Sequence, residues 1–179
     1  LTEDHALLGL SILERERVFH GHGSEGEKES IFTAVKYHNK LSIPETAGGD
    51  TLVLCQLIRD ADKLDILDQV VRFYENPEKM PFLDVESYPK SDSCNPRMIS
   101  DLLQGKLISY SDVKTSADIK LVRMSWLLDF SFHEALASAV REKYLERLMA
   151  FMPRTEDVVR VYEYIRAIMI EKNHKKFYK

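Results

Sequence analysis

The stretch from Thr51 to about Asn76 constrains the fold more than any other part of this sequence. Its apolar residues recur every three or four positions, which is the period of an α-helix that buries one side. Pro77 follows directly, and proline ends a helix because it has no amide proton to donate. The sequence therefore predicts one long central helix over these residues.

The other apolar patterns predict six further helices. Ser24 and Asn95 are typical cap residues, and Pro96 suits a first helical position. The prolines and serines of residues 77–95 predict a loop, and Pro153 separates the last two helices. The expected helices cover residues 2–18, 24–40, 96–104, 115–128, 133–150 and 155–172.

The predicted fold class is all-α, because no stretch keeps the alternation of a β-strand. At 179 residues and 44% hydrophobic content, the chain fits one domain with a sizeable core. We expect a single irregular multi-helix bundle over residues 1–179. Residues 1–76 would form the core that carries the site, and residues 77–179 would complete the bundle.

Composition narrows the classes of function. A net charge of −4 argues against binding of duplex nucleic acid. No apolar run reaches the roughly 20 residues needed to cross a membrane, and no signal peptide is recognisable, so a cytoplasmic location is expected. Cys55 and Cys94 lack the spacing of a zinc site and are expected to be free thiols. A homodimer is a further expectation for such a bundle.

Two histidines fall on the apolar stripes of predicted helices. His5 has the helical spacing of Leu8 and Ile12, and His38 ends a stripe that contains Ala34. Burying an ionisable group is costly unless a partner or a metal ion compensates it. Each histidine is therefore either a hydrogen-bonded core residue or a metal ligand.

A carboxylate has the same property in the central helix. Asp62 shares a face with Cys55, Ile58 and Ile66, whereas Asp60 lies about 200° away around the helix. Two imidazoles and one carboxylate are a suitable ligand set for Mn, Fe, Co, Ni or Mg. An ion pair between Asp62 and an arginine such as Arg123 is the structural alternative.

Three segments resemble the HD superfamily of metal-dependent phosphohydrolases. The run Asp-Ala-Asp-Lys-Leu-Asp at residues 60–65 resembles the family segment that carries the last metal-binding aspartate. The run His-Ala-Leu-Leu-Gly at residues 5–9 resembles the element after the family's His-Asp pair. His38, ahead of Ile43 and Pro44, resembles a later family histidine. Order and spacing agree over about residues 2–70.

The resemblance implies an all-α HD-type bundle and an active site. It implies that Asp62 binds a divalent metal, and that His5 and His38 bind metal, contact phosphate or donate a proton to the leaving group. Lys63 matches a phosphate-contacting position, and Arg59 is a second cationic candidate. The expected reaction is attack of metal-activated water on phosphorus. The expected substrate is a nucleotide or another small phosphorylated metabolite.

One departure from the family pattern leaves two alternatives. The family's first histidine and its His-Asp pair should precede His5, but no His-Asp dipeptide occurs in these 179 residues. Those ligands either lie before Leu1 in the parent protein or are missing from a degenerate member. In the second case the chain would be a non-catalytic module that binds a nucleotide or a protein partner.

Overall fold

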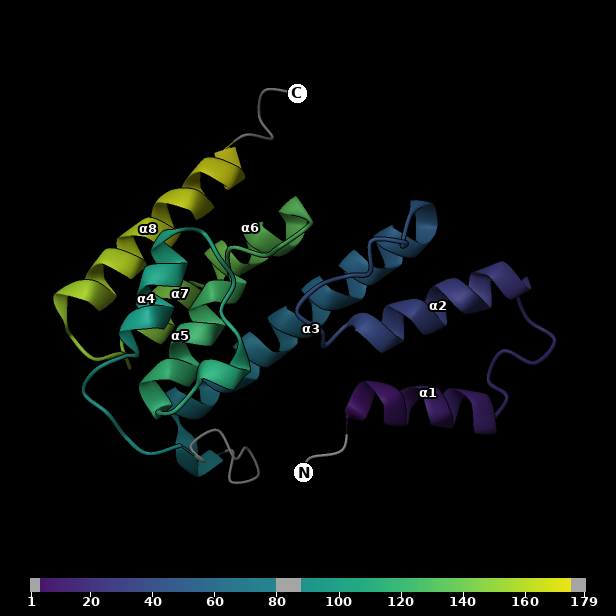
Figure 1. Cartoon of the computed structure of the whole chain (residues 1–179), viewed down its shortest axis with the longest axis horizontal. Coiled ribbons are helices and arrows are strands. Elements are labelled where there is room, and N and C mark those ends of the chain that lie inside the picture. The colour runs from purple at the N-terminus through teal and green to yellow at the C-terminus, as the bar shows by residue number, and fades with distance from the viewer. Residues whose placement is uncertain (1–3, 80–87, 175–179) are drawn as a thin grey trace. The chain divides into compact units, whose positions relative to one another are not determined.

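The structure is a computed structural model that describes residues 4–79 and 88–174 of the chain. In these ranges all regular elements are helices, which confirms the predicted all-α class. The helices, with η marking 3₁₀ turns, are α1 (His5–Arg15), α2 (Glu25–Tyr37), α3 (Gly49–Glu75), η1 (Pro77–Lys79), α4 (Pro96–Leu103), η2 (Tyr110–Asp112), α5 (Ser116–Trp126), α6 (His133–Arg141), α7 (Tyr144–Met149) and α8 (Glu156–His174) (Figure 1).

The chain forms two compact units, Leu1–Asp62 and Lys63–Lys179, which we call the N-terminal and C-terminal units. The boundary falls within α3, so the long helix predicted from residues 51–76 contributes one half to each unit. The single bundle expected over the whole chain stays a prediction. Residues 80–87 of the predicted 77–95 loop lie outside the described residues.

In the N-terminal unit, α1 and α2 pack against each other as neighbours (Figure 1). A Cβ atom on Gly9 of α1 would lie 3.8 Å from Cγ1 of Val35, an ordinary van der Waals distance, so this side of α1 faces α2. The Ser30 hydroxyl on α2 hydrogen-bonds the Thr51 hydroxyl at the start of α3, with 2.7 Å between the oxygens. These contacts join all three helical segments of the unit.

Capping side chains begin the helices where the sequence predicts them. Ser24 and Glu27 form a reciprocal capping box at the start of α2. Asn95 accepts a hydrogen bond from the first turn of α4, with Pro96 as the first helical residue. Thr115 caps α5 in the same way. These starts were predictable because capping depends on residues adjacent in sequence.

The prediction of one continuous helix over residues 133–150 is wrong. The helix is broken between α6 and α7 by Lys143, which has a φ of 55° in the left-handed region. On α7, after the break, Arg147 makes two 2.8 Å hydrogen bonds to the Glu75 carboxylate at the end of α3. A tertiary ion pair therefore accompanies a backbone conformation that lysine rarely adopts.

Helix α5 is the centre of the C-terminal unit. All its residues from Ser116 to Ser125 are buried, although three of them are charged. Lys120 places its ammonium 4.9 Å from the centre of the Tyr74 ring, and Arg123 donates a 2.6 Å hydrogen bond to the Tyr74 hydroxyl. The surrounding core includes Leu67, Leu102, Leu121, Leu145, Leu148 and Ile165.

Candidate functional site

Two imidazole rings meet where α1 begins and α2 ends. His5 is the first residue of α1, and His38 directly follows α2. Their Nε2 atoms lie 3.0 Å apart, and the rings stand edge to face at 63°. The structure therefore brings together two of the predicted site residues, which are separated by 33 positions in sequence.

A backbone hydrogen bond assigns the protonation of His38. Its Nδ1 atom lies 2.6 Å from the carbonyl oxygen of Val35. Because a carbonyl only accepts, Nδ1 must carry the proton, and in the neutral ring Nε2 then presents a lone pair. In that neutral tautomer of His38, the donor of the 3.0 Å contact is His5 Nε2. In proteins, a metal-binding histidine commonly donates its other ring N–H to a backbone carbonyl, which fixes the orientation of the imidazole.

The spacing of the two nitrogens fits a metal ion. Ligands about 2.1 Å from a metal at right angles are roughly 3 Å apart, which matches the separation of the His5 and His38 nitrogens. The pair can therefore occupy two adjacent coordination positions. Across residues 4–79 and 88–174, no group of three or more His, Cys, Asp or Glu side chains is gathered for metal binding.

The predicted inward face of α1 is wrong. His5 is exposed, and Leu8 and Ile12 are 42% and 39% exposed. Ala6 is the buried residue of the helix, and Gly9 contacts α2. Gly9 belongs to the predicted stripe and does contact α2, whereas the larger apolar members of the stripe, Leu8 and Ile12, are exposed.

Asp4 holds the two histidine-bearing segments together. One carboxylate oxygen accepts hydrogen bonds from the Ala6 amide, 3.0 Å away, and from the Asn39 side chain, 2.8 Å away. The other oxygen pairs with Lys40. Asp4 thus caps α1 and ties it to the segment after α2. The predicted helix begins at Thr2, so the capping role of Asp4 was not predicted, although an aspartate before an apolar run is a typical cap.

Acid should weaken this clamp. Lys40 first, then Asn39 and the Ala6 amide, hold the pKa of Asp4 well below its usual range. A lowered folded-state pKa means that the ionised group adds stability above about pH 5, and that this stability is lost as the pH falls through 4 and below. We expect Asp4→Asn to be less stable than wild type at pH 7, with a difference that becomes smaller at pH 2. Urea unfolding followed by circular dichroism at both pH values measures this.

The control for that prediction is Asp92→Asn, because Asp92 is exposed in the C-terminal unit. It should unfold like wild type at both pH values. If Asp4→Asn kept the full acid sensitivity of the wild type, Asp4 would not be the group responsible.

Two of the aspartates of α3, Asp60 and Asp62, differ from their predicted burial. Asp62, predicted to point inward, is partly exposed, whereas Asp60 is only 2% exposed. The buried positions of the helix here include Arg59, Asp60 and Lys63. The prediction assumed that apolar residues alone mark the buried face, but long or hydrogen-bonded polar side chains occupy much of it. The metal-binding role of Asp62 stays a prediction.

Arg59 has a structural role in the N-terminal unit. Its guanidinium donates hydrogen bonds to the carbonyl oxygens of Tyr37, Lys40 and Leu41, at the end of α2 and just after it. Carbonyls at a helix C-terminus lack partners within the helix, so the arginine satisfies them. This use of Arg59 explains its burial without any contact to a substrate.

Lys63, the predicted phosphate-contacting residue, is buried and paired. Its ammonium lies 2.5 Å from a carboxylate oxygen of Asp129 and 2.7 Å from the carbonyl oxygen of the same residue. The pairing had no sequence signal, because 66 positions separate the two residues.

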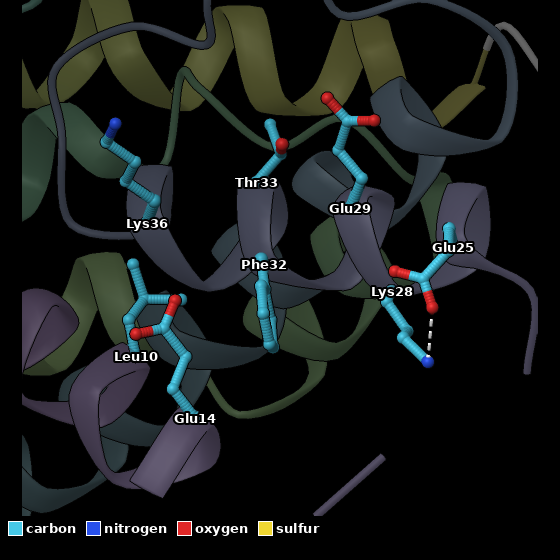
Figure 2. Close-up of a pocket in the computed structure, with 8 residues that line it drawn as sticks. All are labelled: Leu10, Glu14, Glu25, Lys28, Glu29, Phe32, Thr33 and Lys36. Carbon is cyan, nitrogen blue, oxygen red and sulfur yellow. Dashed lines mark hydrogen bonds and ion pairs between the residues drawn. The ribbon is translucent and has the colours of Figure 1, made fainter. Parts of the chain in front are cut away.

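A groove of about 370 Å³ lies between α1 and α2. Figure 2 shows Leu10 and Glu14 of α1 beside Phe32 of α2, with Lys28 bonded to Glu25 farther along the same helix. The histidine pair does not line this groove. The groove is therefore separate from the site at the start of α1, and we assign it no chemistry.

The two cysteines are free thiols, as predicted. Burial raises the pKa of Cys94 to about 12, and the nearby Asp118 charge adds to the effect. Burial also raises the pKa of Cys55. A thiol that stays protonated is a poor nucleophile, so neither cysteine is a candidate for covalent catalysis.

Comparisons of the chain with protein-family models, with curated proteins and with solved structures found no match. Among the helices of residues 4–79 and 88–174, none has the length and apolar character to cross a membrane. The site is therefore interpreted from its own residues: a histidine pair held by Asp4, with Asp62 on the third helical segment of the same unit.

Proposed function

We propose that this protein is a metal-dependent phosphohydrolase that acts on a nucleotide or another small phosphorylated metabolite. The observation that carries the proposal is the 3.0 Å separation of the Nε2 atoms of His5 and His38. The bond from His38 to the Val35 carbonyl supports it, because it leaves Nε2 available as a ligand. The resemblance of residues 60–65 adds Asp62 as the expected carboxylate ligand.

His5 and His38 would supply two ligands of the divalent cation, and Asp62, which the structure does not gather with them, would have to approach as the third. Such a cation supplies Lewis acidity toward a phosphoryl oxygen and lowers the pKa of water to about 7. In the reaction, a water oxygen forms a new bond to phosphorus while the bond from phosphorus to the leaving oxygen breaks. The leaving oxygen keeps that electron pair and takes up a proton. Asp4 contributes by holding His5 beside His38.

The first test is hydrolysis by the intact protein. Turnover of p-nitrophenyl phosphate and of a panel of nucleotides is measured with Mn²⁺ and with a chelator. We expect turnover with Mn²⁺ alone. Loss of a second-shell partner typically costs 10–100-fold, so loss of the ligand itself in His38→Ala or Asp62→Ala should lower turnover by at least about 100-fold.

Matched controls are His20→Ala and Asp65→Asn, which change exposed residues of the same types. Both should keep wild-type turnover. Binding of Mn²⁺, measured by calorimetry, should weaken in His38→Ala and remain unchanged in His20→Ala. If wild type shows no metal-dependent turnover, or if Asp62→Ala keeps full activity, this proposal is wrong. Ligand-dependent stabilisation without hydrolysis would instead favour a binding module.

A further inference from the structure

Arg123 of α5 is a buried cation that has no carboxylate partner among the described residues. It is 7% exposed, and its guanidinium makes one hydrogen bond, from Nη1 to the Tyr74 hydroxyl 2.6 Å away. The Nε atom is buried and has no hydrogen-bond partner. A buried donor of a charged group is costly when nothing accepts from it, so such an atom indicates a bound water or ion.

A second cation lies beside the first in the same unit. Lys120 precedes Arg123 by three positions on α5, is 9% exposed, and places its ammonium 4.9 Å from the centre of the Tyr74 ring. The guanidinium carbon of Arg123 lies 5.9 Å from the same ring centre. We call these three residues the Tyr74 cluster. Two positive charges that converge where little water screens them repel each other, and a bound anion would offset this repulsion.

The buried carboxylate of the same helix does not complete the hydrogen bonding of Arg123. Asp118 accepts from the backbone amides of Asn95, Lys114 and Thr115. Its charge adds to the surroundings of the cluster, but its oxygens are directed to the starts of α4 and α5. The Nε–H of Arg123 is therefore left for an acceptor from outside the described residues.

We propose that the Tyr74 cluster is a binding site for the phosphate group of a small molecule or for inorganic phosphate. A guanidinium presents parallel N–H groups, Nε–H among them, that match two oxygens of a phosphate. Lys120 adds a point charge on a flexible stem, which suits the same ligand. The small exposed fractions of both cations leave an edge by which an anion can approach. This inference does not rest on the proposed function, because the cluster lies entirely within the C-terminal unit.

The experiment measures binding of inorganic phosphate to the intact protein by calorimetry, and thermal unfolding in sodium phosphate and in sodium chloride of equal ionic strength. A chelator is present throughout, so that metal-dependent hydrolysis does not contribute. We expect the melting temperature to be at least about 4 °C higher at a phosphate concentration 100 times Kd, because a ligand that binds the folded state stabilises it.

Arg123→Met tests the site directly, because methionine fills similar space without a charge or a donor. We expect it to bind phosphate at least about 10-fold more weakly, since it loses charge-assisted hydrogen bonds, and to lose the phosphate-dependent rise in melting temperature. Arg160→Met is the matched control, because Arg160 is exposed and pairs with Asp157. It should keep the wild-type response to phosphate.

Other results would overturn the proposal. These are a wild type that melts at the same temperature in phosphate and in chloride, or phosphate binding that is unchanged in Arg123→Met. If Arg123→Met does not fold, Arg123→Lys keeps the charge but loses the parallel N–H groups. It should also bind at least about 10-fold more weakly, and unchanged binding would count against the site.

A parallel titration with AMP separates the two sources of the anion. Tighter binding of AMP than of inorganic phosphate, lost in Arg123→Met, supports the phosphate group of a larger molecule as the ligand. Equal binding of the two, again lost in Arg123→Met, supports inorganic phosphate. Because Arg123 is outside the unit of the histidine pair, phosphate bound at that pair would not respond to this substitution.

Discussion

Replacing Asp118 by alanine is expected to lower the free energy of unfolding by about 4 kcal/mol, because it leaves three backbone amides without their acceptor, at roughly 1–3 kcal/mol each before relaxation. Asp118 is 1% exposed. One carboxylate oxygen accepts from the Asn95 amide at 2.7 Å, and the other accepts from Lys114 and Thr115 at 3.1 and 3.0 Å. A single side chain therefore joins the starts of α4 and α5.

Urea unfolding followed by circular dichroism measures this effect, with Asp157→Ala as the matched control at an exposed helix start. Asp118→Asn should also be destabilising. Both oxygens of the aspartate accept hydrogen bonds from backbone amides, and the NH₂ group of asparagine would replace one of these oxygens with a donor. A loss of this size is a large part of the roughly 5–15 kcal/mol that stabilises a typical domain. Equal midpoints for Asp118→Ala and Asp157→Ala would show that these hydrogen bonds contribute little.

The second large effect is expected from Leu121→Ala, which should cost about 3 kcal/mol of unfolding free energy, since a buried leucine leaves a cavity when it is shortened. Leu121 is fully buried on α5, the helix that is covered on all sides. Thermal or urea unfolding of the variant measures the loss.

Leu57→Ala is the matched control, because Leu57 is 54% exposed on α3. It should shift stability by no more than about 0.5 kcal/mol, as surface substitutions usually do. A Leu121→Ala protein as stable as Leu57→Ala would contradict the central position of α5 in the core.

The helix starts were predicted best. The two histidines of the pair were also predicted, but the surroundings of one of them were not. Ser24, Asn95 and Thr115 mark helix starts through hydrogen bonds to their own neighbours, so sequence is enough to find them. His5 and His38 were selected because they fall on apolar stripes, and they do meet. The reason given for His5 was wrong, since its helix leaves that stripe largely exposed.

Other features depended on partners far away in the chain. The partners of Lys63 and Arg123 are Asp129 and Tyr74, at separations of 66 and 49 positions. No local pattern encodes such pairs, so the buried charges of α5 and the buried side of α3 could not be predicted. The break at Lys143 belongs to the same class, because lysine does not favour a positive φ.

The sequence by itself determined that this protein is all-α, where most of its helices begin and end, and which two histidines are candidates for a metal site. Only the tertiary structure decided which faces are buried, that Asp4 rather than a residue before it caps α1, and that Asp129 holds Lys63. The physical reason is the separation in sequence over which each effect acts. Periodicity and capping act between residues within a few positions of each other, whereas burial of a charge depends on the one distant side chain or carbonyl that can compensate it.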